Sequence, residues 1–365
     1  MSTLNIFNSS VSSTNVTDAS VDGGPKFSPK TSAEIFLASL KILIGIVGVL
    51  GNLTVCIVVA KMRSQKNYAN SLIVSQAVTD LVTALVLIAT TFTEIFPGSP
   101  PSNYAMGYLY CVFWYSRVTM FCMFSISTFN LVAISLERYI AVIHPIWYSH
   151  HFSRKVAAIL ATAAWLLGPL MQTILGFTEL TFEAGNCKFL NRTPVAQAIT
   201  GVTLFLWDFF VPCILMAFCF IQISVKFQNQ KKRVGASEMS TTMTSAQTQA
   251  TTITRARSDT EGRADKNDTD ADATSEPAQQ SRKKNNRGRN ITKTLAIVFL
   301  VYVICWSPDQ FLFLQWNLGG NIDFGGVLHS VVVIMAMLNS ACNPFIYALR
   351  YKQYKEGLKS LFKCF

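Results

Sequence analysis

One carboxylate, Asp80, lies inside a run of apolar residues, and four other polar side chains occur in similar runs: Ser127, Asn339, Ser340 and Asn343. An ionisable side chain in such surroundings is costly unless polar groups satisfy it. Carboxylate, hydroxyl and amide oxygens are also the ligands that hard cations take. The set therefore indicates either a hydrogen-bonded polar network or a site for a bound cation.

A second set of charged side chains lies in other apolar runs. Arg117 stands in the third run, Asp208 in the fifth, and Asp309 with Gln310 directly after Pro308 in the sixth. Charges in such surroundings pair with one another or with a bound molecule. We therefore expect Arg117 to pair with Asp208 or Asp309, or a polar ligand to satisfy both signs. Nearby aromatic residues are Trp114, Trp207, Phe311, Phe313 and Trp316.

The apolar runs that carry these residues define the fold. The chain has 365 residues, of which 50% are hydrophobic and only 14% are charged, a composition that is poor for a soluble globule. A helix needs about 20 apolar residues to cross a bilayer. Runs of this length cover 35–60, 72–96, 108–143, 156–177, 195–225, 291–316 and 327–349. We expect an all-α membrane protein, a bundle of seven transmembrane helices.

The distribution of positive charge predicts the orientation. Lys61, Arg63 and Lys66 follow the first run, Arg154 and Lys155 precede the fourth, and further lysines follow the seventh. Positive residues in short connections are retained on the cytoplasmic side. The N-terminus is therefore expected outside the cell.

The chain divides into five segments. Residues 1–32 are expected to form a disordered extracellular tail, in which Asn8 and Asn15 begin glycosylation sequons. Residues 33–227 hold five helices, 228–289 a disordered third intracellular loop, and 290–349 the last two helices. Residues 350–365 resemble an amphipathic juxtamembrane helix, on which Cys364 is either a palmitoylation acceptor or a free thiol.

The net charge of +11 does not indicate nucleic acid as a partner. Most of the excess lies next to the apolar runs, where it sets topology and attracts anionic membrane lipid. The sequence shows no nucleophile and base combination and no cluster of metal ligands. An enzyme is therefore not expected.

Nine cysteines are present, and their placement decides which can pair. Six lie in the apolar runs, where a thiol is ordinary packing. Only Cys111, at the outer end of the third run, and Cys187, between the fourth and fifth runs, reach the oxidising side. We predict a disulfide between them.

Three short motifs occur in a fixed order. Glu137-Arg138-Tyr139 ends the third run, Cys305-Trp306-Ser307-Pro308 lies in the sixth, and Asn343-Pro344-Phe345-Ile346-Tyr347 lies in the seventh. Prolines inside helices introduce kinks about which segments can swing. With these motifs the chain resembles a class A, rhodopsin-like G protein-coupled receptor everywhere except the N-terminal tail and the third intracellular loop.

The resemblance implies a role for each motif. Arg138 would engage a heterotrimeric G protein and Glu137 would restrain it at rest, while Tyr347 would move toward Arg138 on activation. Trp306 would form the floor of the ligand pocket. No cofactor is required, but Na⁺ would act as an allosteric ion at Asp80, Ser127, Asn339, Ser340 and Asn343. Arrestin and receptor kinases would be further partners, and the plasma membrane the location.

The chain also departs from the family pattern. Phe220 replaces a usual tyrosine, Tyr302 replaces a usual phenylalanine, and Cys111 lies about two residues farther from Arg138 than usual. We expect a bulge or an extra half-turn at the outer end of the third run. No acidic residue lies between Arg282 and Lys293, where many relatives restrain the arginine, so we expect measurable basal activity.

The ligand class follows from exclusions. The seventh run contains no lysine for a retinal Schiff base, and residues 113–127 contain no acid to pair with a monoamine. Residues 179–189 are consistent with a hairpin such as similar neuropeptide receptors carry. A peptide ligand is our expectation, and a small polar or amine-like ligand is the alternative. A seven-helix transporter or channel is disfavoured because no inverted repeat is visible.

Overall fold

The structure is a computed structural model that describes residues 32–61, 69–96, 98–230, 275–323 and 326–362. Within these ranges seven helical spans are long and apolar enough to cross a membrane, which confirms the predicted seven-helix bundle. They are α1 (Ser32–Lys61), α2 (Ala69–Ile95), α4 (Val118–Ile143), α6 (Arg154–Glu179), the span Pro194–Gln230, α9 (Ser275–Asn317) and α10 (Val327–Arg350).

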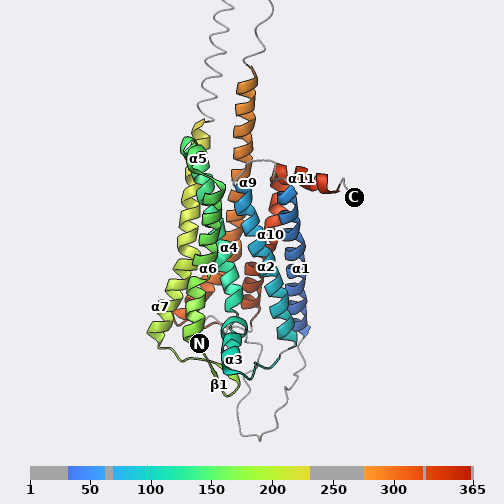
Figure 1. The fold of residues 1–365 in the computed structure, drawn as a ribbon. Coiled ribbons are helices and arrows are strands. Elements are labelled where there is room, and N and C mark those ends of the chain that lie inside the picture. Colours follow the sequence, from blue (N-terminus) through green and yellow to red (C-terminus); the bar gives the residue numbers. More distant parts are fainter. Residues whose placement is uncertain (1–31, 62–68, 97, 231–274, 324–325, 363–365) are drawn as a thin grey trace, which may run out of the picture.

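The spans run alternately up and down, so α1 begins and α10 ends at opposite ends of the bundle (Figure 1). We call one end the hairpin end, because it holds β1 (Leu180–Glu183) and β2 (Asn186–Phe189), and the other the α11 end, after α11 (Lys352–Phe362). The central span is α4, the most buried of the seven, while α6 is the least buried. Ile159, Leu166 and Ile174 of α6 are exposed and face the position of lipid.

The third span is interrupted near the hairpin end. The structure divides this span into α3 (Tyr104–Tyr110), a π-helical turn η2 (Cys111–Tyr115) and α4, which confirms the bulge expected at its outer end. Between η2 and α4, Arg117 has a left-handed backbone with φ 64° and ψ 14°. The irregularity accounts for the unusual spacing of Cys111, since a π turn holds extra residues within a continuous helix.

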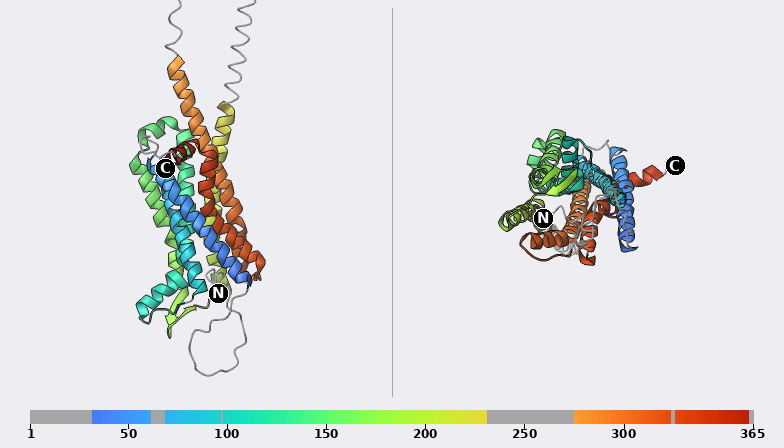
Figure 2. Two further views of the ribbon diagram at one scale, coloured as in Figure 1. Left: turned by 90° about the vertical axis from the view of Figure 1, so that its right-hand side faces the viewer. Right: turned by 90° about the horizontal axis from the view of Figure 1, so that it is seen from below.

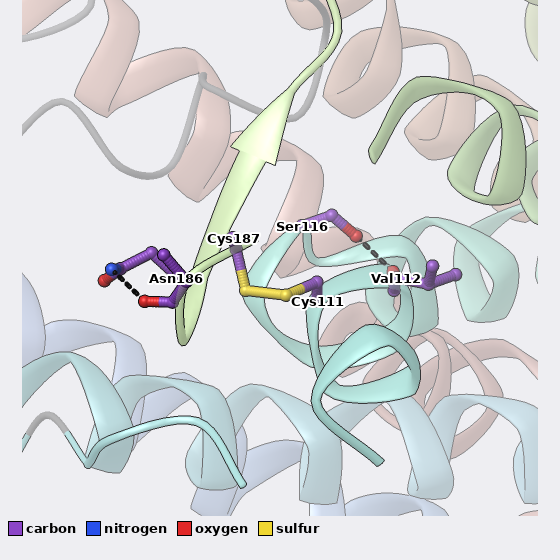
Figure 3. The surroundings of a disulfide bond; sticks show 6 residues. Cys111, Val112, Ser116, Asn186 and Cys187 are labelled. Atoms are coloured by element: carbon purple, nitrogen blue, oxygen red, sulfur yellow. Dashed lines mark hydrogen bonds between the residues drawn. A yellow bond between two sulfur atoms is a disulfide. The ribbon is translucent and has the colours of Figure 1, made fainter. Parts of the chain in front are cut away.

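The hairpin predicted within residues 179–189 is confirmed. β1 and β2 are antiparallel with Phe182 opposite Cys187, and the turn between them has positive φ at Ala184 and Gly185, as tight hairpins require. Cys187 forms the predicted disulfide with Cys111 at a Cα–Cα distance of 5.4 Å (Figure 3). The bond fixes the hairpin to the end of the third span.

The fifth span starts at α7 (Pro194–Phe205), where the Thr193 side chain accepts a hydrogen bond from the amide of Ala196 and proline occupies the first turn. It continues through a π turn, η3 (Leu206–Phe210), and stays helical to residue 230. A short helix, α5 (Pro145–His151), joins α4 to α6 at the α11 end.

Two predictions about the flanking segments can be compared with the structure. α11 lies across the bundle axis, as expected for an amphipathic helix (Figure 1). The expectation of disorder up to residue 289 is wrong for residues 275–289, because α9 starts at Ser275 and extends past its neighbours (Figure 2). Asn8, Asn15, Cys364 and residues 231–274 lie outside the described residues.

Candidate ligand cavity and switch residues

Asp80 is fully buried in the middle of the bundle, as predicted. Ser127 on α4 donates to its Oδ1 at 3.0 Å, and Asn343 on α10 donates to its Oδ2 at 2.8 Å. Gln76, one helical turn away on α2, donates to both carboxylate oxygens at 3.1 Å and to the Ser127 hydroxyl at 2.6 Å. The Asp80 carboxylate is therefore held by neutral donors from three helices.

The residues around Asp80 also fit a small cation. Asn339 Oδ1 and Asn343 Oδ1, both on α10, are buried acceptors without a hydrogen-bond partner. Buried acceptors without a donor are costly, and a set made only of oxygens suits a hard cation such as Na⁺. Asn339 and Ser340 are both buried on α10, and Ser340 lies beside Asp80.

A cavity lies between α4, α6, α9, α10 and the fifth span, toward the hairpin end from Asp80. The cavity is small, with a volume of about 30 Å³. Apolar and aromatic side chains form most of its wall, and Phe124 packs edge-on against Trp306 at 4.8 Å between ring centroids. The predicted pocket residues Asp208, Trp306, Asp309, Gln310 and Phe313 all line this cavity.

Asp208 stands in the π turn of the fifth span and is held by neighbouring helices. Gln172 on α6 donates to Asp208 Oδ2 at 2.7 Å, and the Ser125 hydroxyl on α4 donates to Oδ1. Tyr302 on α9 donates to the Asp208 main-chain oxygen at 3.0 Å and accepts from Thr128 at 3.3 Å. These contacts link the floor of the cavity to three helices.

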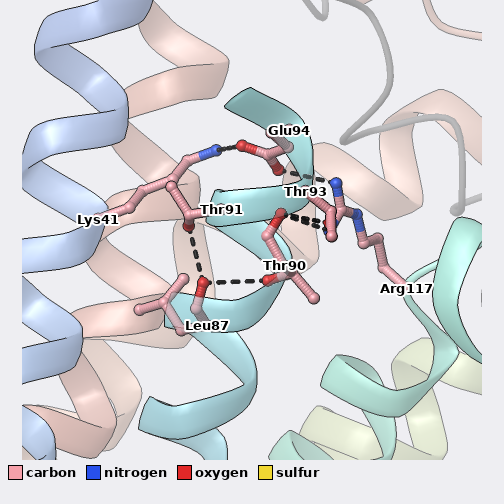
Figure 4. Close-up of polar contacts among 7 residues, drawn as sticks. All are labelled: Lys41, Leu87, Thr90, Thr91, Thr93, Glu94 and Arg117. Carbon is pink, nitrogen blue, oxygen red and sulfur yellow. Dashed lines mark hydrogen bonds and ion pairs between the residues drawn. The ribbon is translucent and has the colours of Figure 1, made fainter. Parts of the chain in front are cut away.

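Arg117 does not line this cavity, so the predicted ion pair with Asp208 or Asp309 is wrong. Its guanidinium lies 3.0 Å from Glu94 on α2 and donates to the Thr90 main-chain oxygen at 3.1 Å (Figure 4). Lys41 on α1 contacts the other oxygen of Glu94 at 3.0 Å. The left-handed backbone at the start of α4 turns the Arg117 side chain toward α2 and away from the fifth span.

The predicted switch residues gather at the α11 end. Arg138 is buried and pairs with Glu137, which also accepts a hydrogen bond from Tyr148 of α5 at 2.5 Å. Tyr347 is buried, and its ring packs edge-on against Tyr354 of α11. The Tyr139 ring packs against Phe218 of the fifth span. The structure thus brings the first and third motifs to the same end of the bundle.

A further contact at this end was not predicted. The Lys226 ammonium of the fifth span donates to the last carbonyl oxygens of α4, those of Val142 at 2.7 Å and Ile143 at 3.0 Å. Carbonyls at a helix C-terminus have no partner within the helix, and a cation there is favourable. Lys226 therefore ties the fifth span to α4 beside Arg138.

Sequence reasoning missed four polar residues of these sites: Gln76, Glu94, Ser125 and Gln172. Gln76 precedes Asp80 by four residues, which places both side chains on the same face of a helix. That spacing was a usable signal. Glu94 and Gln172 carried no comparable signal, because their contacts depend on how neighbouring helices are rotated.

Comparison with known proteins agrees with the fold and the motifs. Residues 51–347 match the model of the 7 transmembrane receptor (rhodopsin family). The chain is 25% identical to the octopamine receptor beta-2R of Chilo suppressalis over 88% of this chain and 78% of the relative. It is 25% identical to the human histamine H2 receptor over 92% and 81%, respectively. It is 26% identical to the melatonin receptor type 1A of Phodopus sungorus over 93% and 82%.

The match covers more than half of the chain, so the protein belongs to the rhodopsin family of seven-transmembrane receptors. It is a multi-pass membrane receptor of the G protein-coupled class and not an enzyme. The alternative of a transporter or channel has no support from these matches.

Proposed function

We propose that this receptor lies in the plasma membrane with its hairpin end outside, binds a small amine-like ligand in the cavity, and activates a heterotrimeric G protein through the α11 end. The observation that carries the ligand class is that two carboxylates, Asp208 and Asp309, line a small cavity above Trp306. Carboxylates in apolar surroundings favour a cationic ligand.

Three observations favour this ligand over the peptide expected from the sequence. The cavity is small, and the cation that was expected to balance its acids, Arg117, is paired with Glu94 on α2. Two of the relatives are named for amines, histamine and octopamine. The acid missing from residues 113–127 is replaced, in this proposal, by acids on the fifth span and α9.

The remaining parts of the proposal concern the other sites. Na⁺ would occupy the oxygen cluster around Asp80 and favour the resting state, supplying a charge that the neutral donors there lack. Arg138 would engage the G protein, and arrestin and receptor kinases would act on the activated receptor. Asn8 and Asn15 would carry glycans and Cys364 a palmitoyl group.

The proposal is tested in cells that express the full chain, with cyclic AMP and intracellular Ca²⁺ as readouts. Histamine, octopamine and other primary amines are compared with melatonin, which carries no ammonium, and with a peptide library. We expect a response to one or more amines that weakens at least about tenfold in Asp208→Asn, the loss of one charge-assisted contact. Arg117→Gln is the matched control and is expected to respond like the wild type.

Two results would overturn the proposal. The first is a response to peptides with none to amines. The second is an amine response that is unchanged in both Asp208→Asn and Asp309→Asn. Nucleotide exchange on purified G protein, with and without the active amine, tests the coupling step directly.

A further inference from the structure

The wall of the cavity carries acidic side chains but no basic ones among the described residues that line it. Among the described residues that line it, Asp208 and Asp309 are acidic and none is Lys, Arg or His. The nearest cationic cluster, Arg117 with Lys41, contacts Glu94 in a separate small cavity toward α1 and α2. The wall therefore presents two negative groups to a bound molecule.

Each carboxylate is held by neutral donors. Asp208 accepts from Gln172 and Ser125, and Asp309 accepts one long hydrogen bond of 3.4 Å from Gln310. Neutral donors orient a carboxylate but do not cancel its charge, and a buried charge without a counter-charge is destabilising. A ligand with one ammonium would neutralise only one of the two acids.

The two acids lie at different depths in the cavity. Tyr302 contacts the main chain of Asp208, and Asp309 follows Tyr302 by seven residues on α9. Seven residues of helix rise roughly 10 Å. No described side chain hydrogen-bonds to both carboxylates: Asp208 accepts from Ser125 and Gln172, and Asp309 accepts from Gln310. One ammonium in contact with Asp208 would then leave Asp309 to a second group.

We infer that the ligand is a dication, with two amine-like groups spaced by a short chain: one binds Asp208 at the floor and the other binds Asp309 nearer the mouth. The aromatic wall formed by Phe121, Phe124, Trp306 and Phe313 suits the chain between them and also attracts cations over its ring faces. This inference rests on the proposed amine function and narrows it from one positive centre to two.

The test compares ligands that differ only in the second charge. Thermal unfolding of the purified full-length receptor in lipid nanodiscs is followed with 1,4-diaminobutane, with 4-aminobutan-1-ol, in which a hydroxyl replaces one amine, and with 1-aminobutane. The longer diamines 1,5-diaminopentane and 1,6-diaminohexane cover the range of spacing. We expect the best diamine to bind at least about tenfold more tightly than the amino alcohol, as one charge-assisted hydrogen bond implies.

Variants assign the second charge to a residue. Asp309→Asn is expected to reduce the advantage of the diamine over the amino alcohol to about one. Asp208→Asn is expected to weaken all three probes. Glu183→Gln, which removes an exposed acid of the hairpin, is the control for general attraction of cations and is expected to change nothing.

The outcomes separate the inference from the proposed function. Equal affinity for the amino alcohol and every diamine, or a diamine advantage that survives in Asp309→Asn, would overturn the dication while leaving the amine receptor intact. No binding of any amine would overturn the proposed function itself. Should Asp309→Asn fail to fold, the comparison of probes on the wild type still decides the question.

Discussion

The amide of Gln76 occupies the position where a cation would contact Asp80. It donates to both oxygens of the carboxylate and to Ser127, so it competes with Na⁺ for the same acceptors. In Gln76→Leu these hydrogen bonds are lost and the acceptors become available. We expect two linked effects: lower stability without Na⁺, and stronger stabilisation by Na⁺ than in the wild type.

The magnitude follows from the contacts. Hydrogen bonds to a charged group contribute roughly 1.5–3 kcal/mol. A loss of about 2 kcal/mol lowers the unfolding temperature of a domain by a few degrees. Na⁺ at about 100 times its Kd stabilises the folded state by about 2.7 kcal/mol. Gln76→Leu should therefore be clearly less stable than the wild type in choline chloride and nearly equal to it in NaCl.

The assay is thermal unfolding of the full chain in nanodiscs, with NaCl exchanged for choline chloride at constant ionic strength. Gln172→Leu is the matched control, because Gln172 is also a buried glutamine that donates to a carboxylate, but to Asp208 in the ligand cavity. It should lose stability equally in both salts. Asp80→Asn added to Gln76→Leu should remove the Na⁺ response. If Gln76→Leu and the wild type respond identically to Na⁺, the competition argument fails.

Three further predictions concern other contacts. Tyr302→Phe removes the hydroxyl that joins α9 to Asp208 and Thr128. Basal nucleotide exchange should then rise above that of the wild type, and the wild type itself should exceed mock cells. Lower exchange in the variant would contradict this role. Arg117→Ala should unfold at a lower temperature than Arg117→Gly, which is the reverse of the usual order in helices. The reason is that a left-handed backbone costs a non-glycine residue about 1 kcal/mol. Equal unfolding temperatures would argue against the strained turn. Gly168→Ala should sharply reduce the amount of folded receptor at the cell surface, because a Cβ there would lie 2.7 Å from the Ile126 amide nitrogen. Gly98→Ala, whose Cβ would meet open space, is the control and should express normally. Similar surface labelling of both variants would contradict the close packing of α6 on α4.

Much of the fold could be predicted because its determinants are local. Seven apolar runs identify the spans, and the disulfide follows from the two cysteines that reach the oxidising side. The break at Arg117 could not be located in the same way. Apolar periodicity is nearly the same for an α and a π turn, so the pattern of residues does not indicate where the hydrogen bonding changes.

The candidate sites were predicted less completely because contacts between helices depend on rotation and depth. Asp208 and Asp309 were assigned to one cavity correctly, since both lie in the outer halves of their apolar runs. Arg117 was assigned to the wrong partner, because the left-handed turn before α4 redirects its side chain to Glu94. That turn is a property of the assembled bundle and has no signature at Arg117 itself.

The two π turns, η2 in the third span and η3 in the fifth, change how residues of this receptor can be matched to those of any receptor whose spans are regular there. An α-helix advances about 100° per residue, so each residue added within a turn rotates everything beyond it by roughly that angle. Counting outward from Arg138 along the third span, the α-helix is uninterrupted only as far as Val118. Beyond that point the same offset in a regular relative selects a side chain on a different face, and a ligand contact transferred by numbering would be assigned to the wrong residue.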